Sequence, residues 1–314
     1  MRLGVAGAIA LGGLLFTPSA RATFPGANGK IFYSSNLAGP TRDIYRINPD
    51  GTSAQRLTGP TAPFTHGDED KPDVSPDGKT IALVFEDDDP NATYEYVIYL
   101  VNRDGSNPRL VAVGSDPAWS PDGTKIAYTS ISDEAGYQLA IMNADGTGKH
   151  LITPPDLDKA RYAPDWSADG SRIAFVRRRL DDPDIHTQIG TVKPDGSGLK
   201  IITALTTKNA YDPYWSPDSQ RIVFTEQMPT GSEIWVMNKD GTGQQQLTDG
   251  HFDLHATWSP DGTKIVFASE RDVGFQLFTM PSAGGAVTEL THPPAGAPQT
   301  LRQWRPYWDP KHSG

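Results

Sequence analysis

The stretch PAWSPDGTKIAYTS, residues 117–130, joins a tryptophan, a tight turn and a short apolar strand. Pro121 suits the turn because proline fixes φ, and Asp122-Gly123 accepts the positive φ that closes a hairpin. The residues after the turn are rich in β-branched and aromatic side chains, which favour a strand. The pattern recurs as PDVSPDGKTIALVF, PDWSADGSRIAFVR, PYWSPDSQRIVFTE and ATWSPDGTKIVFAS, and a shortened PYWDP lies near the C-terminus.

These recurrences define a repeat whose period is in the forties. Each unit adds a third strand such as QLAIMN, a second Asp-Gly turn such as Asp145-Gly146, and a short polar strand such as KHLIT. Four short strands at this period are typical of a β-propeller blade. The position of the tryptophan is occupied by Val74, Trp119, Trp166, Trp215, Trp258 and Trp308.

The two ends of the repeat region predict how the ring closes. NGKIFYSS, residues 28–35, reads as a second strand without a clear first strand, and RPYWDP, residues 305–310, reads as a first strand without a second. Together they complete one blade, although Phe24 is an alternative occupant of the tryptophan position. We therefore expect one all-β domain over residues 23–314, a six-bladed propeller of four-stranded blades closed by its N- and C-terminal strands. We expect the tryptophans to pack between blades and the Ser-Pro-Asp-Gly aspartates to serve the turns.

Residues 1–22 differ from the rest of the chain. Arg2 precedes an apolar run, and the segment ends in the small-residue pattern of Ala20 and Ala22. Such a segment is typical of a cleaved secretory signal, so we expect cleavage after Ala22 and export to the periplasm or the extracellular space. The remaining chain has no apolar stretch of membrane length, which predicts no membrane insertion.

Composition excludes several classes of function. The formal net charge of −10 disfavours binding to nucleic acid, whose phosphates would be repelled. The absence of cysteine excludes a thiol nucleophile and a cysteine-ligated zinc site. No Gly-x-Ser-x-Gly elbow or phosphate-binding loop is found either.

The repeat resembles a known family. WSPDGTKIAYTS followed by IMNADGTGKHLIT is similar to the propeller repeat of TolB, a component of the bacterial Tol–Pal envelope system. The resemblance runs through the chain from residue 23 onwards, but it covers the propeller alone, without the separate α/β domain that precedes it in TolB. It implies the propeller fold and a role in binding envelope or secreted proteins or peptides.

The loops predict where a partner would bind. The Asp-Gly turns of a propeller lie on one face, here called the turn face. The loops that lead into each blade, or join its second and third strands, lie on the opposite loop face. Side chains near the start of each inner strand should meet around the channel mouth on that face and bind a peptide, a sugar or a charged small ligand. The alternative is that these charges only solvate the mouth. The candidate binding residues are Lys71, Asp116, Arg161, Tyr162, Tyr211, Asp212, His255, Trp304 and Arg305.

Histidines and acidic loops are weaker candidates for a metal site. His251 and His255 are four residues apart but precede a strand, so the helical argument for a shared face does not apply. The acidic segments at residues 66–70 and 86–91 contain the oxygen ligands that calcium prefers, without EF-hand spacing. Calcium is the one cofactor for which the sequence offers candidates. The candidate ligands are His66, Asp68, Asp70, Glu86, Asp87, His251 and His255.

We therefore favour a non-enzymatic, monomeric binding scaffold of the cell envelope or extracellular space. The alternative is a metal-dependent lyase or hydrolase that acts on a carbohydrate or small molecule in the channel mouth. Convergence of histidines and carboxylates on one point would favour the enzyme. A third hypothesis is a domain that works only beside a separate enzyme or transporter.

Overall fold

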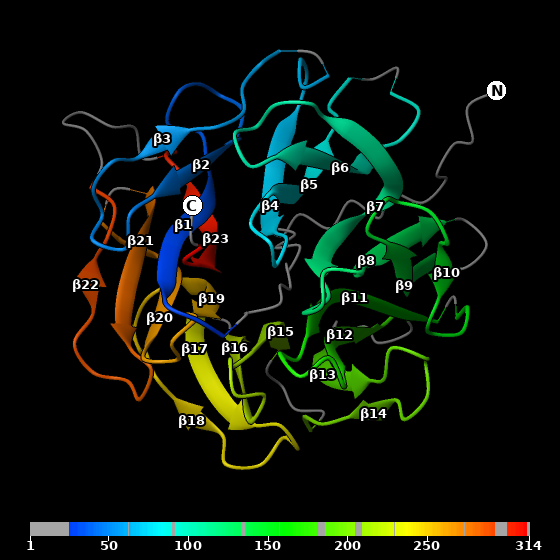
Figure 1. Cartoon of the computed structure of the whole chain (residues 1–314). Helices are drawn as coiled ribbons and strands as arrows, with labels where there is room; N and C mark the ends of the chain where they lie inside the picture. Colours follow the sequence, from blue (N-terminus) through cyan, green and yellow to red (C-terminus); the bar gives the residue numbers. More distant parts are fainter. Residues whose placement is uncertain are drawn as a thin grey trace.

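The computed structural model describes residues 25–61, 63–89, 92–132, 136–156, 158–180, 186–204, 209–228, 230–272, 274–292 and 300–312. The regular elements in these ranges are β-strands, and their sheets are arranged around a common centre (Figure 1). Within the same ranges no helix is long and apolar enough to cross a membrane. The predicted signal segment, residues 1–22, and its cleavage site lie outside the described residues.

Four of the sheets have four antiparallel strands each. One of them joins strands from the two ends of the chain, where Ile31 of β1 pairs with Trp308 of β23. This closing sheet consists, in order, of β23 (Gln303–Pro310), β1 (Asn28–Ser35), β2 (Asp43–Ile47) and β3 (Gln55–Arg56). The second sheet consists of β11 (Lys159–Trp166), β12 (Ile173–Arg179), β13 (Thr187–Val192) and β14 (Lys200–Ile201), and the third of β15 (Asn209–Trp215), β16 (Arg221–Met228), β17 (Gly231–Asn238) and β18 (Gln245–Gln246). The fourth consists of β19 (Asp253–Trp258), β20 (Lys264–Asp272), β21 (Gly274–Pro281) and β22 (Thr288–Glu289).

The fifth sheet has seven strands and corrects the expectation of six separate four-stranded sheets. Its central strand, β7 (Arg109–Trp119), pairs with β6 through its first half and with β8 through its second half. Elsewhere a two-residue outer strand ends before the next sheet begins, whereas β7 continues without a break. The other strands, in sheet order, are β10 (His150–Leu151), β9 (Gly136–Asn143), β8 (Lys125–Ser132), β6 (Tyr96–Asn102), β5 (Thr80–Glu86) and β4 (Asp68–Val74).

A threonine explains where the other outer strands stop. The Oγ1 of Thr58 accepts the backbone N–H of Ile44 at 2.9 Å, so a side chain takes over the pairing that a longer strand would provide. At the equivalent position β7 has Ala112, which pairs with Ile98 through its backbone. The strand therefore runs on. The same capping contact, at 2.9 to 3.0 Å, is made by Thr153, Thr203, Thr248 and Thr291.

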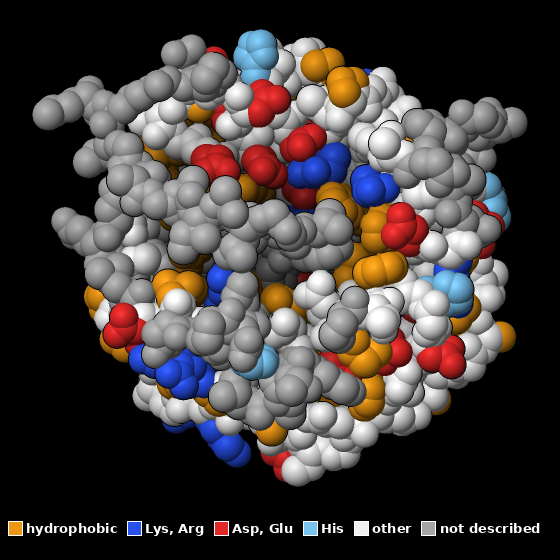
Figure 2. All heavy atoms as spheres, turned by 180° about the vertical axis from the view of Figure 1, so that it is seen from behind, with side chains coloured by type: hydrophobic (Ala, Val, Ile, Leu, Met, Phe, Trp, Pro, Cys, Tyr) orange, Lys and Arg blue, Asp and Glu red, His pale blue; other side chains and the backbone are white. Residues whose placement is uncertain are grey.

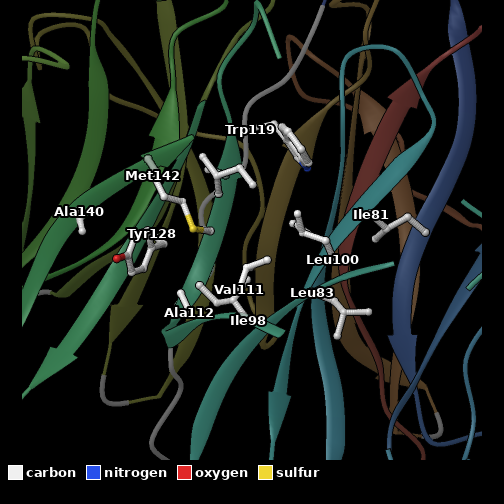
Figure 3. Close-up of a cluster of buried hydrophobic side chains, with 14 of the residues drawn as sticks. Ile81, Leu83, Ile98, Leu100, Val111, Ala112, Trp119, Tyr128, Ala140 and Met142 are labelled. Atoms are coloured by element: carbon white, nitrogen blue, oxygen red, sulfur yellow. The ribbon is translucent and has the colours of Figure 1, made fainter. Parts of the chain in front are cut away.

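The tryptophans pack between successive sheets, as the repeat predicts. The Nε1 of Trp166 donates to the backbone oxygen of Ala118, and the Nε1 of Trp258 donates to that of Tyr214. Figure 3 shows part of the core in the seven-stranded sheet, with Trp119 near Leu100. Burial of each large apolar side chain stabilises the fold by about 1.5–3 kcal/mol, so these contacts hold neighbouring sheets together.

The Ser-Pro-Asp-Gly aspartates serve their turns. The hydroxyl of Ser75 donates to Asp77 at 2.6 Å and is the largest cause that holds the pKa of this carboxyl below its ordinary value. The equivalent bonds, at 2.5 to 2.7 Å, join Ser120 to Asp122, Ser167 to Asp169, Ser216 to Asp218, and Ser259 to Asp261.

Candidate functional site

The centre of the molecule is built from one position that recurs in every inner strand. Three residues before each tryptophan position, the backbone has a φ of 50 to 55°. The pairing register of each inner strand shifts at this point, which marks a β-bulge with one extra residue. Non-glycine residues rarely adopt this conformation, so the surrounding packing must hold it. The six residues are Lys71, Asp116, Ala163, Asp212, His255 and Arg305.

These six side chains form a buried layer and do not line an open mouth. Each is at most 4% exposed. The Nζ of Lys71 lies 2.5 Å from the Oδ1 of Asp116, and the Nδ1 of His255 lies 2.9 Å from the Oδ2 of Asp212. The structure thus brings together residues far apart in the sequence, but it pairs their charges inside the propeller.

Asp70 is the centre of the remaining contacts in this layer. Its carboxylate lies 3.2 Å from the Nε of Arg305 and accepts a hydrogen bond from the Ser34 hydroxyl at 2.5 Å. Burial alone would raise the pKa of Asp70, but Arg305, Arg42 and the hydroxyl outweigh it and hold that pKa well below its ordinary value. Asp70 is therefore a fixed negative charge.

Burial also sets the protonation of the paired histidine. It lowers the pKa of His255, and the opposing effect of Asp212 is smaller. The imidazole is consequently neutral near pH 7, with the nearby carboxylate favouring a proton on Nδ1.

Arg42 occupies the centre of the predicted acidic metal site. Its guanidinium lies 3.1 Å from both Asp68 and Glu86, and 3.6 Å from Asp70. These carboxylates thus neutralise a protein cation, which leaves them poorly placed for calcium. Asp87 follows the end of β5 and accepts a hydrogen bond from the backbone N–H of Asp89.

The histidine candidates do not converge either. His66 and His251 are exposed, whereas His255 is fully buried. Across the part of the chain that the structure describes, no group of three or more histidine, aspartate or glutamate side chains is placed to hold a metal ion.

Aromatic side chains lie between the buried layer and the solvent. Tyr162, Tyr211 and Trp304 are half-buried, next to the fully buried positions Ala163, Asp212 and Arg305. The Trp304 ring has guanidinium carbons of Arg42 and Arg305 at 5.3 and 5.5 Å from its centroid. Burial raises the pKa of both tyrosines, so their hydroxyl groups stay protonated donors.

Arg161 belongs to an inter-sheet contact. It is 6% exposed, donates to the Gln138 side chain at 2.7 Å and pairs with Asp156 at 3.2 Å. Figure 2 shows the loop face, where acidic and basic side chains lie close together.

Several contributors were not predicted from the sequence. The Thr129 hydroxyl donates to Asp116 at 2.9 Å and accepts the backbone N–H of Ala163 at 3.1 Å, which ties two successive units together. Thr225 accepts the N–H of His255 in the same way. Hydroxyl residues at the same place of β1, β8 and β16 were the available signal, whereas Arg42 lies in a loop that varies between units.

A buried carboxyl pair was also missed. Glu69 and Asp43 are each 2% exposed, and Arg56 lies 2.9 Å from Asp43. Burial, together with the charge of Asp43, raises the pKa of Glu69 to about 9. The pair therefore retains a proton at neutral pH.

Comparison with known proteins identifies the family of the repeat. The family model described as the TolB beta propeller domain matches residues 130–306. A Tol-Pal system protein TolB from Gluconobacter oxydans is 35% identical over 105 residues, which cover 32% of this chain and 22% of that protein. An uncharacterized protein from Agrobacterium fabrum is 28% identical over 187 residues, 56% of this chain and 60% of that protein. The chain thus spans less than two thirds of either relative.

A solved structure supports the same fold. The crystal structure of TolB from Acinetobacter baumannii superposes with a TM-score of 0.70 at 19% identity, covering 90% of this chain and 67% of that one.

Proposed function

Because this chain belongs to the TolB β-propeller family, we propose that it is a binding scaffold that holds a protein or peptide partner on its loop face. The proposal includes no catalytic activity of its own. The relatives named TolB support a partner from the cell envelope or from outside the cell.

The half-buried aromatic residues above the buried charge layer carry this proposal. Tyr162, Tyr211 and Trp304 offer apolar surface with polar edges, the kind of anchor that dominates protein interfaces. The charges beneath them are paired with one another, so they favour a rigid platform over a reactive centre. A rigid aromatic platform loses little conformational entropy when a partner binds.

The mixed charges beside the platform suit a peptide. Arg42, Asp68 and Glu86 are only partly buried and offer both donors and acceptors. Their pairing leaves the rim polar without a large net charge, as in the rims of protein interfaces.

For the architecture we propose six four-stranded units in a closed ring. Two observations support it. Residues 109–113 of β7 pair as the outer strand of one unit and residues 114–119 as the inner strand of the next. The pairing of β1 with β23 joins the two ends of the chain.

For location and assembly we propose an exported monomer that does not insert into membranes or bind nucleic acid. The apolar segment at residues 1–22 and the net charge of −10 support this. The metal-dependent lyase or hydrolase gains no support from the described residues, because Arg42 occupies the acidic cluster and the histidines lie apart.

Affinity purification from the producing cells tests the proposal. The bait is the chain from residue 23, compared with a variant that carries Tyr162→Ala, Tyr211→Ala and Trp304→Ala. Leu151→Ala is the matched control, because Leu151 is exposed on the outer strand β10. We expect one protein to be retained by the parent and the control and lost from the triple variant, with circular dichroism confirming the fold of each. Identical protein lists from all three baits would contradict it.

A further inference from the structure

Two grooves on the turn face are formed by equivalent residues of two different units. The first groove has a volume of about 520 Å3 and the second about 170 Å3. In each, the Ser-Pro-Asp segment of one unit faces the tryptophan and the Asp-Gly turn of the next unit. The shared positions are Ser75, Pro76, Asp77, Trp119, Asp122 and Gly123 in the first groove, and Ser216, Pro217, Asp218, Trp258, Asp261 and Gly262 in the second.

One position accounts for much of the difference in volume. In the second groove the guanidinium of Arg221 lies over the ring of Trp258, with its central carbon 4.7 Å from the ring centroid. In the first groove the equivalent residue is Thr80, whose short side chain cannot extend in this way. The first groove therefore lacks the cation that fills its counterpart.

The repeat shows that Thr80 departs from the other units. The other five have lysine or arginine there: Lys30, Lys125, Arg172, Arg221 and Lys264. Around Thr80 the Thr-Lys order of Thr124-Lys125 and Thr263-Lys264 is reversed to Lys79-Thr80. Lys79 consequently points outward, with a side chain that is 81% exposed.

Acceptor groups are also present in this unit, although Asp77 is paired at 3.6 Å with the exposed Lys79. Asn143 accepts a hydrogen bond from its cross-strand neighbour Lys125 at 2.6 Å, and Asn102 is the equivalent neighbour of Thr80. The carboxylates of Asp77 and Asp122 face the groove, and both have a pKa below the ordinary value. For Asp77 the Ser75 hydroxyl is the main cause, and for Asp122 the turn hydrogen bonds outweigh a burial effect.

We propose that this groove, between Pro76 and Trp119, binds an arginine side chain of a partner protein, in the place that Arg221 fills in the second groove. A planar guanidinium can stack against an aromatic ring and bond to carboxylates at the same time, whereas an ammonium is a compact point charge. Figure 3 shows Trp119 next to Leu100, which gives the inner wall of the groove an apolar surface for the arginine stem.

The aspartates of the surrounding surface favour a basic protein segment as the partner, although Lys30, Lys193 and Lys200 lie beside some of them. The aspartates of the turns lie on this face. Burial raises the pKa of several of them, and for Asp122, Asp169, Asp218 and Asp261 it is the largest single effect, but the hydrogen bonds from turn hydroxyl and N–H groups together outweigh it. The pKa of each aspartate is therefore lowered and each is ionised at neutral pH. These residues are Asp50, Asp77, Asp104, Asp122, Asp145, Asp169, Asp195, Asp218, Asp240 and Asp261.

Arg109 opposes the proposed ligand to a limited degree. It lines the same groove, but one of its terminal nitrogens donates to the backbone oxygen of Asp145 at 2.6 Å, which directs its charge to the rim. Removal of this charge by Arg109→Gln should tighten binding of an added guanidinium.

A nuclear magnetic resonance titration tests the site. The probe is N-acetylarginine amide, and the signal is the indole N–H of Trp119, assigned with Trp119→Phe. The matched control is the double variant Lys79→Thr with Thr80→Lys, which has the same composition and charge but restores the order of the other units. We expect a saturable shift in the parent, and binding about tenfold weaker in the double variant and for the neutral analogue N-acetylcitrulline amide.

Other outcomes would overturn the proposal. An unmoved Trp119 signal would mean that the groove binds no guanidinium. Equal shifts for parent and double variant would place the binding elsewhere. Equal shifts for citrulline, or larger shifts for N-acetylglutamate amide, would show that the site does not select a cation. If the double variant fails to fold, Thr80→Met fills the groove without charge and should abolish the shift. The groove lies on the turn face, so a negative result for guanidinium binding there would not contradict the proposal of a binding scaffold on the loop face.

Discussion

The imidazole of His255 lies 2.9 Å from the carboxylate of Asp212, and both residues occupy the same bulged position in successive inner strands. Lys71 and Asp116 repeat this relationship in another pair of units. The bulge thus directs these side chains to the centre, where polar side chains from neighbouring units pair. This buried layer connects neighbouring units beneath the proposed binding surface.

Removal of a buried ion pair in this layer should lower the stability of the protein more than removal of an exposed ion pair. Lys71→Ala leaves the buried Asp116 carboxylate without its main cation, so we expect a loss of about 3–5 kcal/mol in the free energy of unfolding. Adding Asp116→Ala should recover part of that loss. Urea unfolding measures both. Lys79→Ala, which removes an exposed ion pair with Asp77, is the control and should cost less than about 1 kcal/mol.

Stability should fall as pH rises because of Glu69. Its pKa is raised from 4.5 to about 9 in the folded chain, so the folded state keeps a proton that the unfolded state releases. Between these values the free energy of unfolding falls by up to about 1.4 kcal/mol per pH unit. Glu69→Gln should remove this slope and stabilise the chain near pH 8.

Urea midpoints from pH 5 to pH 9 measure that dependence. Glu95→Gln is the control, because Glu95 is exposed. A slope that persists in Glu69→Gln would assign the pH dependence to other groups.

The strand-ending threonines can be tested with an isosteric change. Thr248→Val removes the oxygen that accepts the backbone N–H of Ile234 and leaves that buried donor unsatisfied. We expect a loss of about 1–3 kcal/mol in thermal or urea unfolding. Thr263→Val, in an exposed turn, should change stability much less. Equal losses would argue against the capping role.

Arg42 should prevent calcium binding at the acidic cluster. If calcium does not bind at this cluster, neither calcium chloride nor EDTA should change the melting temperature of the parent chain. Arg42→Gln removes the cation shared by Asp68 and Glu86, while Asp70 keeps Arg305 at 3.2 Å, so we expect a melting temperature that rises with calcium concentration. A calcium-dependent rise in the parent would contradict the assignment of Arg42 as the resident cation.

Repetition explains which features the sequence could predict. Trp166 and Trp258 recur at a fixed place in their units, so their packing between sheets followed from the pattern alone. The six positions three residues before each tryptophan position share one backbone conformation, which repetition of the unit makes regular. Their burial was not expected, since the sequence does not reveal that Lys71 and Asp116 pair across neighbouring units.

The errors arise where one unit departs from the others. The seven-stranded sheet depends on Ala112 at a position where other units have threonine, a difference that matters only through the capping hydrogen bond. The sequence also did not reveal that Arg42, from a variable loop, pairs with the acidic metal candidates Asp68 and Glu86. Periodicity carries no information about such contacts.

Photocrosslinking at position 304 tests the central claim most directly. A photoreactive p-benzoylphenylalanine replaces Trp304 on the loop face, and in a control chain it replaces Gln245, which is exposed on the outer strand β18. Both chains are irradiated in the producing cells and the adducts are identified by mass spectrometry. The scaffold account predicts one discrete protein adduct from position 304 and none from position 245. No adduct at 304, or the same adducts from both positions, would contradict it.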